Sequence, residues 1–265
     1  MTILLTGSTG FVGGHIFKKL SPYYPIVITL RESDLESLFQ TNNIGLVIHC
    51  ATSFSQNNRE ILNTNIIYSS KLLALSVEYG AKFINLDTTS HYYRNNLYSQ
   101  SKKILRDTII GLQFDNSLNL LIELVYGEGE NSNRFLPSQI TSLLNNEPIN
   151  MTKGTQTRNI IHIDDLVDAL ILIVKDIDNI LEYTNEMFLA SSDTISIKEL
   201  MNMLVKLTES SSIIDYGAID YIDNDELNSV TNNQALVNMN WSQKIVLEQG
   251  LIAKVNEMKV KSIDG

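Results

Sequence analysis

Cysteine is nearly absent from this chain, in which Cys50 is the only one among 265 residues. A lone cysteine excludes a disulfide within the chain and a cysteine-based zinc site, and it suits a reducing compartment such as the cytoplasm. The 4 histidines lack the spacing of metal ligands, so we predict no metal site. No apolar run approaches the roughly 18 residues of a membrane span, and no basic segment precedes the first apolar stretch. We therefore expect a soluble protein that is not exported.

Positive charge is also scarce. The chain carries 20 Lys and Arg residues against 30 Asp and Glu residues, and the basic residues form no cluster. A formal net charge of -10 argues against a nucleic-acid partner, although a local basic pocket for a phosphorylated small molecule remains compatible with it. Hydrophobic residues make up 43% of the chain, which excludes intrinsic disorder and suffices for a large domain with a full core.

Short apolar runs typical of buried strands alternate with amphipathic stretches through the first half of the chain. The expected strands are residues 2–5, 25–30, 45–50, 82–86 and 118–125, and the expected helices are residues 13–20, 33–40, 59–79 and 97–112. This alternation predicts an α/β fold with a doubly wound parallel sheet, because parallel strands need helical crossovers.

The pattern loosens after residue 126. Helices are expected at residues 134–145, 163–175 and 196–207, with a short strand at 186–190. We therefore expect a dinucleotide-binding domain over residues 1–126, to which residues 158–190 return. Residues 127–265 are expected to form mainly a smaller, substrate-binding lobe.

A glycine-rich turn follows the first expected strand and opens into a helix. It reads Gly7-Ser8-Thr9-Gly10-Phe11-Val12-Gly13. Glycines allow a tight bend and the close approach of a pyrophosphate, while the helix N-terminus offers free N–H groups and partial positive charge. In this strand-turn-helix context the turn predicts a dinucleotide site on a Rossmann-type sheet. No Lys-Ser/Thr pair follows it, which excludes a P-loop.

The end of the second expected strand bears on the choice of dinucleotide. Arg31 stands there, where an arginine suits the 2′-phosphate of NADPH and an acidic residue would suit the 2′-hydroxyl of NADH. Glu32 follows and blurs this signal, and a solvated arginine is the alternative, but NADPH is favoured over NADH. Asp34 either contacts the adenine amino group or caps the helix that follows.

Tyr98 and Lys102 are four residues apart at the start of the helix expected over residues 97–112. This spacing places a phenol and an ammonium on one helix face. The ammonium favours the phenolate, so the tyrosine can give or take a proton at a carbonyl or alcohol oxygen. A solvated helix pair is the alternative, which the preceding dinucleotide turn and the hydroxyls after residue 86 disfavour.

Together these motifs resemble the extended short-chain dehydrogenase/reductase family, in its nucleotide-sugar branch, over the whole chain. Besides the glycine turn and the Tyr98-Ser99-Gln100-Ser101-Lys102 motif, the resemblance rests on Val47-Ile48-His49-Cys50-Ala51, Asn65, Val125-Tyr126-Gly127-Glu128-Gly129, Arg158-Asn159-Ile160-Ile161-His162-Ile163-Asp164-Asp165 and the late Asn240-Trp241 and Leu247-Glu248-Gln249-Gly250-Leu251.

The resemblance implies further site residues. Thr88 falls at the position of the catalytic Ser/Thr of the family, with Thr89 and Ser90 as neighbouring hydroxyls. It implies cofactor contacts from Leu35, Cys50, Ala51, Thr52 and Asn65, in addition to those named above. It implies substrate contacts from Thr88, Glu123, Arg134, Phe135 and Arg158, with Arg158 at the diphosphate and Lys153 or Arg134 as the next candidates.

The resemblance also implies an activity. The segments at residues 83–88 and 98–103 are most similar to the synthases of CDP-abequose and CDP-paratose. The short interval between Thr88 and Tyr98 and the short segment after Arg31 resemble dTDP-4-dehydrorhamnose reductases. The expected reaction is the NADPH-dependent reduction of the C4 keto group of a nucleotide-linked deoxyhexose, in surface-polysaccharide biosynthesis. Dehydration is disfavoured, because Thr88 is not followed by an acidic pair.

Two other functions remain open, a C4 epimerase with tightly bound NAD and a regulatory protein that binds NADP without turnover. The family further implies a homodimer formed through the helices at residues 59–79 and 97–112. Thicker burial of these two helices within the monomer is the alternative.

Overall fold

The computed structural model describes residues 1–263, and these divide into two compact units. The first unit comprises residues 1–122 and 167–189, and the second comprises residues 123–166 and those from 190 onward. Within the described residues, no helix is long and apolar enough to cross a membrane.

The first unit is built on a parallel sheet of six strands in the order β2-β1-β3-β4-β5-β9. The strands are β1 (Thr2–Thr6), β2 (Ile26–Ile28), β3 (Ile44–His49), β4 (Lys82–Thr88), β5 (Ser117–Ile122) and β9 (Glu186–Phe188). The chain runs outward from β1 to β2 and then back past β1 to β3. Because this reversal separates the loops that leave β1 and β3, it is where α/β sheets of this kind bind ligands.

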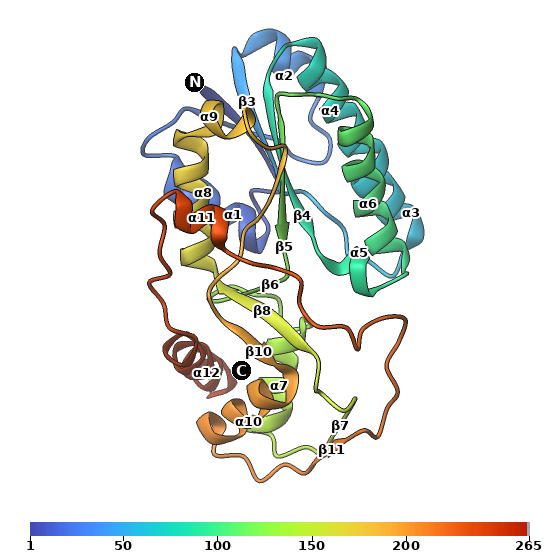
Figure 1. Cartoon of the computed structure of the whole chain (residues 1–265), viewed down its shortest axis with the longest axis vertical. Coiled ribbons are helices and arrows are strands. Elements are labelled where there is room, and N and C mark those ends of the chain that lie inside the picture. Colours follow the sequence, from blue (N-terminus) through green and yellow to red (C-terminus); the bar gives the residue numbers. More distant parts are fainter. Residues whose placement is uncertain (264–265) are drawn as a thin grey trace. The chain divides into compact units, whose positions relative to one another are not determined.

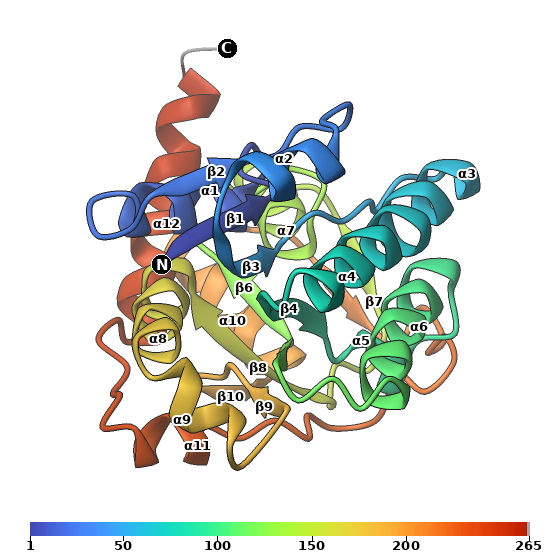
Figure 2. The same cartoon turned by 90° about the horizontal axis from the view of Figure 1, so that it is seen from above.

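Helices cover both faces of this sheet. They are α1 (Phe11–Leu20), α2 (Leu35–Thr41), α3 (Asn58–Ile61), α4 (Ser69–Glu78), α5 (Ser90–Tyr93), α6 (Leu97–Gly111), α8 (Ile163–Lys175) and α9 (Ile177–Leu181). Figures 1 and 2 show α2, α4 and α6 on one face, and α1 and α8 on the other. On the first of these faces, Leu72 and Leu105 pack with Val47 and Phe83 of the central strands in one apolar core. The predicted doubly wound α/β fold is confirmed.

The helix expected over residues 59–79 is continuous but not uniform. Between α3 and α4 the structure has one π-helical segment, η1 (Leu62–Tyr68). Such wider turns occur frequently at functional sites. Here the segment contains Asn65, a predicted cofactor residue, which is buried.

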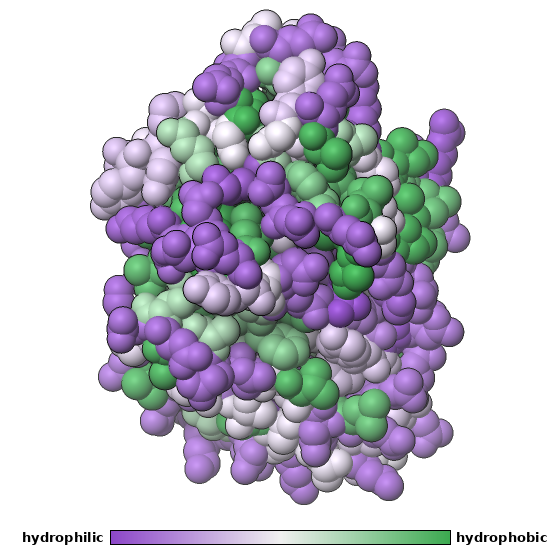
Figure 3. Space-filling view, turned by 45° about the horizontal axis from the view of Figure 1, so that its top comes forward, coloured by the Kyte–Doolittle hydropathy of each residue, from purple (hydrophilic) through white to green (hydrophobic). Residues whose placement is uncertain are grey.

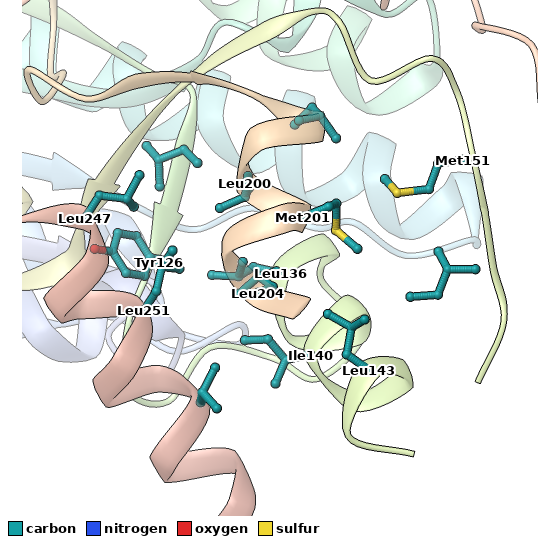
Figure 4. Packing of buried hydrophobic residues seen from close by; sticks show 14 residues of the cluster. Tyr126, Leu136, Ile140, Leu143, Met151, Leu200, Met201, Leu204, Leu247 and Leu251 are labelled. Atoms are coloured by element: carbon teal, nitrogen blue, oxygen red, sulfur yellow. The ribbon is translucent and has the colours of Figure 1, made fainter. Parts of the chain in front are cut away.

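The second unit has small sheets and its own core. Its strands are β6 (Leu124–Tyr126), β7 (Ile149–Met151), β8 (Thr157–His162), β10 (Thr194–Ser196) and β11 (Ile214–Tyr216), and its helices are α7 (Phe135–Leu144), α10 (Ile197–Thr208), α11 (Gln234–Asn238) and α12 (Leu247–Ile263). The strands pair as β10-β8-β6 and β11-β7. Figure 4 shows apolar side chains of α7, α10 and α12 converging beside Tyr126.

The strand expected over residues 118–125 is divided in the structure. Its first part, β5, joins the six-stranded sheet, whereas its last part, β6, pairs with β8 in the second unit. The break falls at Glu123, whose carboxylate accepts hydrogen bonds from the Asn159 backbone N–H at 2.7 Å and the Ser229 hydroxyl at 2.6 Å. The unit boundaries therefore lie at residues 122 and 167 rather than at 126 and 158.

Candidate active site

The turn between β1 and α1 has the geometry that a bound pyrophosphate needs. Gly7 has a φ of 69°, in the left-handed region, and a Cβ there would lie 2.8 Å from the backbone nitrogen of Ala51. A Cβ at Gly13 would overlap the carbonyl oxygen of Gly7, so no larger residue fits either position. Gly10 is the N-cap of α1 and has no side chain to bond the first N–H groups of the helix. These N–H groups are therefore available to an anion.

The ends of β1 and β3 are tied together beside this turn. The Thr6 hydroxyl accepts hydrogen bonds from the backbone N–H groups of Cys50 at 3.1 Å and Ala51 at 3.0 Å. It also shares a hydrogen bond of 2.9 Å with Nδ1 of the buried His49, whose pKa burial lowers to about 3. His49 is therefore a neutral structural residue. Burial raises the pKa of the Cys50 thiol to about 12, so Cys50 is not a nucleophile at neutral pH.

Arg31, Asp34 and Leu35, which follow β2, differ in their exposure and in the contacts that they make. The Arg31 side chain is 82% exposed and donates a hydrogen bond of 2.8 Å to Glu60. Asp34 is the N-cap of α2 and accepts from the backbone N–H of Ser37, which matches the structural one of its two predicted roles. Leu35 is 3% exposed and belongs to the apolar core, so only its backbone can contact a cofactor.

Asn65 connects the loop after β3 to α6. Its side-chain oxygen accepts from the backbone N–H of Ser53 at 2.7 Å and from the Thr52 hydroxyl at 3.3 Å. Its amide donates to the Ser53 carbonyl and to the Ser101 hydroxyl, which precedes Lys102 on α6. Asn65 is 1% exposed and bonded in this way on both sides, so its side chain fixes the loop rather than reaching a ligand directly.

Tyr98 and Lys102 lie on the first turns of α6, as predicted. The helix begins where the Asn96 side chain accepts from the backbone N–H of Ser99 at 2.9 Å. Lys102 is 4% exposed, and its Nζ donates to the carbonyl oxygen of Leu86 on β4 at 2.9 Å. The Tyr98 ring packs on Phe54, with the ring centroids 4.4 Å apart. This holds a buried cation and a half-buried phenol on one helix face.

The three hydroxyl residues after Asp87 are not equivalent. The Thr88 hydroxyl is partly exposed and accepts from the backbone N–H of Ser90 at 3.1 Å. Thr89 is 1% exposed, and the Ser90 hydroxyl is hydrogen-bonded to that of Ser99 at 3.0 Å. Of the three, Thr88 is the side chain best placed to meet a substrate from solvent.

Glu123 and Arg158 are brought together in the second unit. Arg158 is 6% exposed, so it is not a solvated arginine. Its Nη1 donates to the carbonyl oxygens of Thr157 and Leu227, both at 2.7 Å. Its Nη2 donates to the carbonyl and carboxylate oxygens of Asp225 at 2.8 and 2.9 Å, and its Nε lies 3.6 Å from Glu123. The guanidinium thus holds the segment at residues 225–227 against β8.

The other predicted substrate residues begin α7 in the same unit. Arg134 is the N-cap of the helix, and its Nε lies 3.6 Å from Glu130. Phe135, the first residue of the helix, is 37% exposed.

Within the described part of the chain, no group of three or more His, Cys, Asp and Glu side chains is arranged to hold a metal ion. Phe54 and Asp87 escaped the sequence reasoning, although a charged residue at the end of a buried strand is a signal that points to Asp87.

Comparison with known proteins identifies the family. Residues 3–186 match the model of the NAD dependent epimerase/dehydratase family, and the chain belongs to this family. The predicted resemblance to extended short-chain dehydrogenases/reductases is thereby confirmed. The chain is 30% identical to a CDP-abequose synthase of Salmonella muenchen, over 97% of both chains. It is 26% identical to a CDP-abequose synthase of Salmonella typhimurium, over 94% of this chain and 95% of the relative.

Solved structures agree with the fold. The UDP-glucuronic acid 4-epimerase of Bacillus cereus, in complex with UDP-glucuronic acid and NAD, superposes with a TM-score of 0.82 at 19% identity, over 98% of this chain and all of that one. The UDP-glucose 4-epimerase of Thermotoga maritima superposes with a TM-score of 0.78 at 20% identity, over 99% of this chain and all of that one. At such identities the likeness establishes the fold alone.

Proposed function

We propose that this protein is an NADPH-dependent reductase of the C4 keto group of a nucleoside-diphosphate-linked 4-keto-6-deoxyhexose or dideoxyhexose, acting in the cytoplasm in surface-polysaccharide biosynthesis. The observation that carries this proposal is the 30% identity to a CDP-abequose synthase along 97% of both chains. The placement of Thr88 at the end of β4 and of Tyr98 and Lys102 on the first turns of α6 also supports it.

Each of these residues has a distinct role in the proposed reduction. NADPH, when bound, supplies the hydride that C4 accepts. Tyr98 gives its phenolic proton to the oxygen on C4, so that the ketone becomes an alcohol. Lys102, a buried cation one helical turn from Tyr98, lowers the pKa of that phenol and hydrogen-bonds the nicotinamide ribose. Thr88 donates a hydrogen bond to the carbonyl oxygen and so stabilises its developing charge.

The residues around β1 and β3 fit a dinucleotide. The glycine turn at residues 7–13 holds the pyrophosphate on the α1 N-terminus, and the segment Cys50-Ala51-Thr52, braced by Asn65, lines the path toward the nicotinamide. Arg31 contacts the 2′-phosphate of NADPH. It pairs with Glu60 at the surface, where water and salt screen such a pair and make it weak, so a doubly charged phosphate can take the place of Glu60.

Cofactor choice can be tested at Arg31. We expect Arg31→Ala to raise the dissociation constant of NADPH about 10- to 100-fold, since a charge-assisted contact is worth about 1.5–3 kcal/mol, with little change for NADH. Arg59→Ala, at an exposed arginine of α3, is the matched control. Equal weakening of both cofactors would show that Arg31 does not select between them.

The reaction is tested by offering the purified protein NADPH with a panel of CDP-, dTDP-, UDP- and GDP-linked 4-keto-6-deoxyhexoses. Absorbance of the reduced nicotinamide is followed, and the product is analysed for a new C4 hydroxyl. We expect NADPH oxidation with at least one sugar, at a rate proportional to enzyme concentration. No oxidation with any of them, by a protein shown to bind NADPH, would contradict the proposal.

An epimerase is the second candidate, because the chain belongs to the NAD dependent epimerase/dehydratase family. It predicts NAD that stays with the protein through purification. It also predicts interconversion of two nucleotide sugars without net consumption of NADPH. Both outcomes are read from the same incubations.

We further propose a homodimer through η1, α4 and α6. Several apolar side chains of these helices are exposed, among them Leu62, Ile67, Val77, Ile104 and Ile110. Figure 3 shows hydrophobic side chains gathered on the side of the first unit where α4 and α6 lie. Ile67 is 63% exposed, more than expected if these helices were merely buried deeper in the monomer. Ile67→Glu with Ile104→Glu is expected to give a monomer by sedimentation, and an unchanged mass would contradict this interface.

A further inference from the structure

Asp87 is a buried carboxylic acid at the end of β4, next to the proposed catalytic hydroxyl. It is 4% exposed, in a parallel strand whose interior is otherwise suited to apolar side chains. Asp87 shares a strand face with Phe83 and Asn85, because side chains alternate along a strand. Since Phe83 packs with Leu105 and Ile109 of α6, this face is the one that α6 covers.

One carboxylate oxygen of Asp87 holds the backbone at Thr88. Its Oδ1 accepts from the backbone N–H of Thr88 at 2.8 Å. Its Oδ2 is buried and has no hydrogen-bond partner. Burying such a group costs free energy, so its presence beside a reacting residue points to a role beyond packing.

Lys102 reaches the same stretch of β4 from α6. Its Nζ donates to the carbonyl oxygen of Leu86, the residue before Asp87. Lys102 and Asp87 are both 4% exposed, and no direct salt bridge joins them. Their charges nevertheless act on each other, because water is excluded and the local dielectric constant is low. Figure 1 shows α5 and α6 beside β4.

We propose that Asp87 is a positioning residue of this site, which fixes the backbone of Thr88 and keeps Lys102 charged by compensating its buried ammonium. The inference rests on the proposed function for its catalytic meaning, but the coupling of the two charges is a property of the folded chain alone. The sequence motifs did not assign this positioning role to any residue.

The charged and titratable groups around Asp87 are consistent with this role. They are Lys102 and Arg106 on α6, His91 and Tyr92 on α5, and Glu186 on β9. Arg106 is already paired with Glu186, with Nη2 and Oε1 2.8 Å apart, so that pair is nearly neutral. Burial lowers the pKa of His91, which leaves it neutral near pH 7. Lys102 is therefore the cation that the charge of Asp87 affects most.

The directions of the pKa shifts of Asp87 and Lys102 agree with the proposed role of Asp87. Burial raises the pKa of Asp87 to about 6, and the charge of Lys102 acts against this shift. Burial lowers the pKa of Lys102, and the charge of Asp87 acts in the opposite direction. Above pH 6 the carboxylate is ionised and supports the ammonium, whereas below pH 6 this support is lost.

The first test measures Lys102 directly and needs no substrate. Lysines are labelled with ¹³C at Cε, and the Lys102 resonance is identified by its absence in Lys102→Met. We expect Asp87→Asn, which keeps the side-chain shape and the Oδ1 acceptor, to lower the pKa of Lys102 by about one unit, a tenfold change in its ionisation constant. Asp107→Asn, at an exposed carboxylate of α6, is the matched control and should leave it unchanged. An unchanged Lys102 pKa in Asp87→Asn would overturn the proposal.

A reciprocal measurement covers the case in which Asp87→Asn does not fold. In the wild-type protein labelled at aspartate Cγ, Asp87 should titrate near pH 6. In Lys102→Met its pKa should rise further, because the compensating cation is gone. Equal Asp87 pKa values in the two proteins would likewise refute the coupling.

The second test is kinetic. The proposed reduction requires the charged form of Lys102, and removing the Asp87 charge lowers the pKa of Lys102. Asp87→Asn should therefore move the alkaline limb of the kcat profile about one pH unit toward neutrality, which lowers kcat by up to about tenfold on the alkaline side of that limb, with KM changed less than threefold. A parallel loss at all pH values, or a change in KM alone, would indicate a merely structural role. If the wild-type protein reduces no sugar, the proposed function fails, while the lysine titration still decides the coupling.

Discussion

The burial of Arg158 predicts a measurable loss of stability when its side chain is removed. The guanidinium makes four hydrogen bonds to Thr157, Leu227 and Asp225 and lies beside Glu123. Arg158→Ala removes these contacts and takes the guanidinium from beside the carboxylates of Glu123 and Asp225, whose side chains are 4% and 16% exposed. Removing one partner of a buried ion pair costs about 3–5 kcal/mol. Stability of the second unit should fall by that amount.

The assay uses the only tryptophan of the chain. Trp241 lies in the second unit and is 5% exposed, so its fluorescence reports the unfolding of that unit. With a urea m-value of about 2 kcal/mol/M, we expect the midpoint of Arg158→Ala to fall by about 1.5–2.5 M. Lys206→Ala, which removes an exposed charge from α10 of the same unit, should shift it by less than about 0.3 M.

A double-mutant cycle with Asp225→Asn isolates the contact between Arg158 and Asp225. The double variant should be less destabilised than the sum of the two single variants, because both single variants remove the same contact between Arg158 and Asp225. A wild-type midpoint in Arg158→Ala would refute the stabilising role inferred from the contacts. Kinetics are measured well below the midpoint, where loss of the proposed diphosphate contact should raise the sugar KM about 10- to 100-fold with little change in turnover.

Three further predictions concern other sites. Gly13→Ala should weaken dinucleotide binding at least about 100-fold by calorimetry, because the added Cβ would overlap the Gly7 carbonyl. Gly111→Ala is the control, because an added Cβ there has nothing within 4 Å, and it should leave the affinity unchanged. Equal affinities of the two variants would contradict the predicted turn geometry. Tyr98→Phe should lower turnover about 10²- to 10⁴-fold at unchanged NADPH affinity, and wild-type turnover would exclude Tyr98 as the proton donor. Burial raises the pKa of Glu130 to about 7, above its value in the unfolded chain, so the charged form disfavours folding. The urea midpoint should therefore fall as the pH rises from 5 to 8, and Glu130→Gln should flatten this dependence; a slope unchanged in Glu130→Gln would contradict it.

Local patterns in the sequence were enough to predict the parallel sheet of the first unit and the positions of the glycine turn and of Tyr98 and Lys102 on their elements. The alternation of apolar runs and amphipathic stretches predicted the parallel sheet, because strand and helix periodicities are properties of neighbouring residues. The glycine turn and the Tyr98-Lys102 spacing could be recognised for the same reason, because each motif involves only residues that are close in the sequence. The first lies within one glycine-rich turn, and the second lies within two turns of one helix. The structure places all of them where the motifs indicated.

The features that the sequence did not predict depend on contacts between residues that are far apart in the chain. Arg158 and Asp225 are 67 positions apart, so nothing in the sequence showed that this arginine is buried and bonded to the chain itself. The expected strand over residues 118–125 reads as one apolar run, but pairing with β8 draws its last residues into the second unit. The position of Asp87 at the end of an apolar run is a signal in the sequence, but only the packing of α6 over β4 shows that its carboxylate is buried. Burial and charge compensation depend on which elements meet in space, and that was determined only by the tertiary structure.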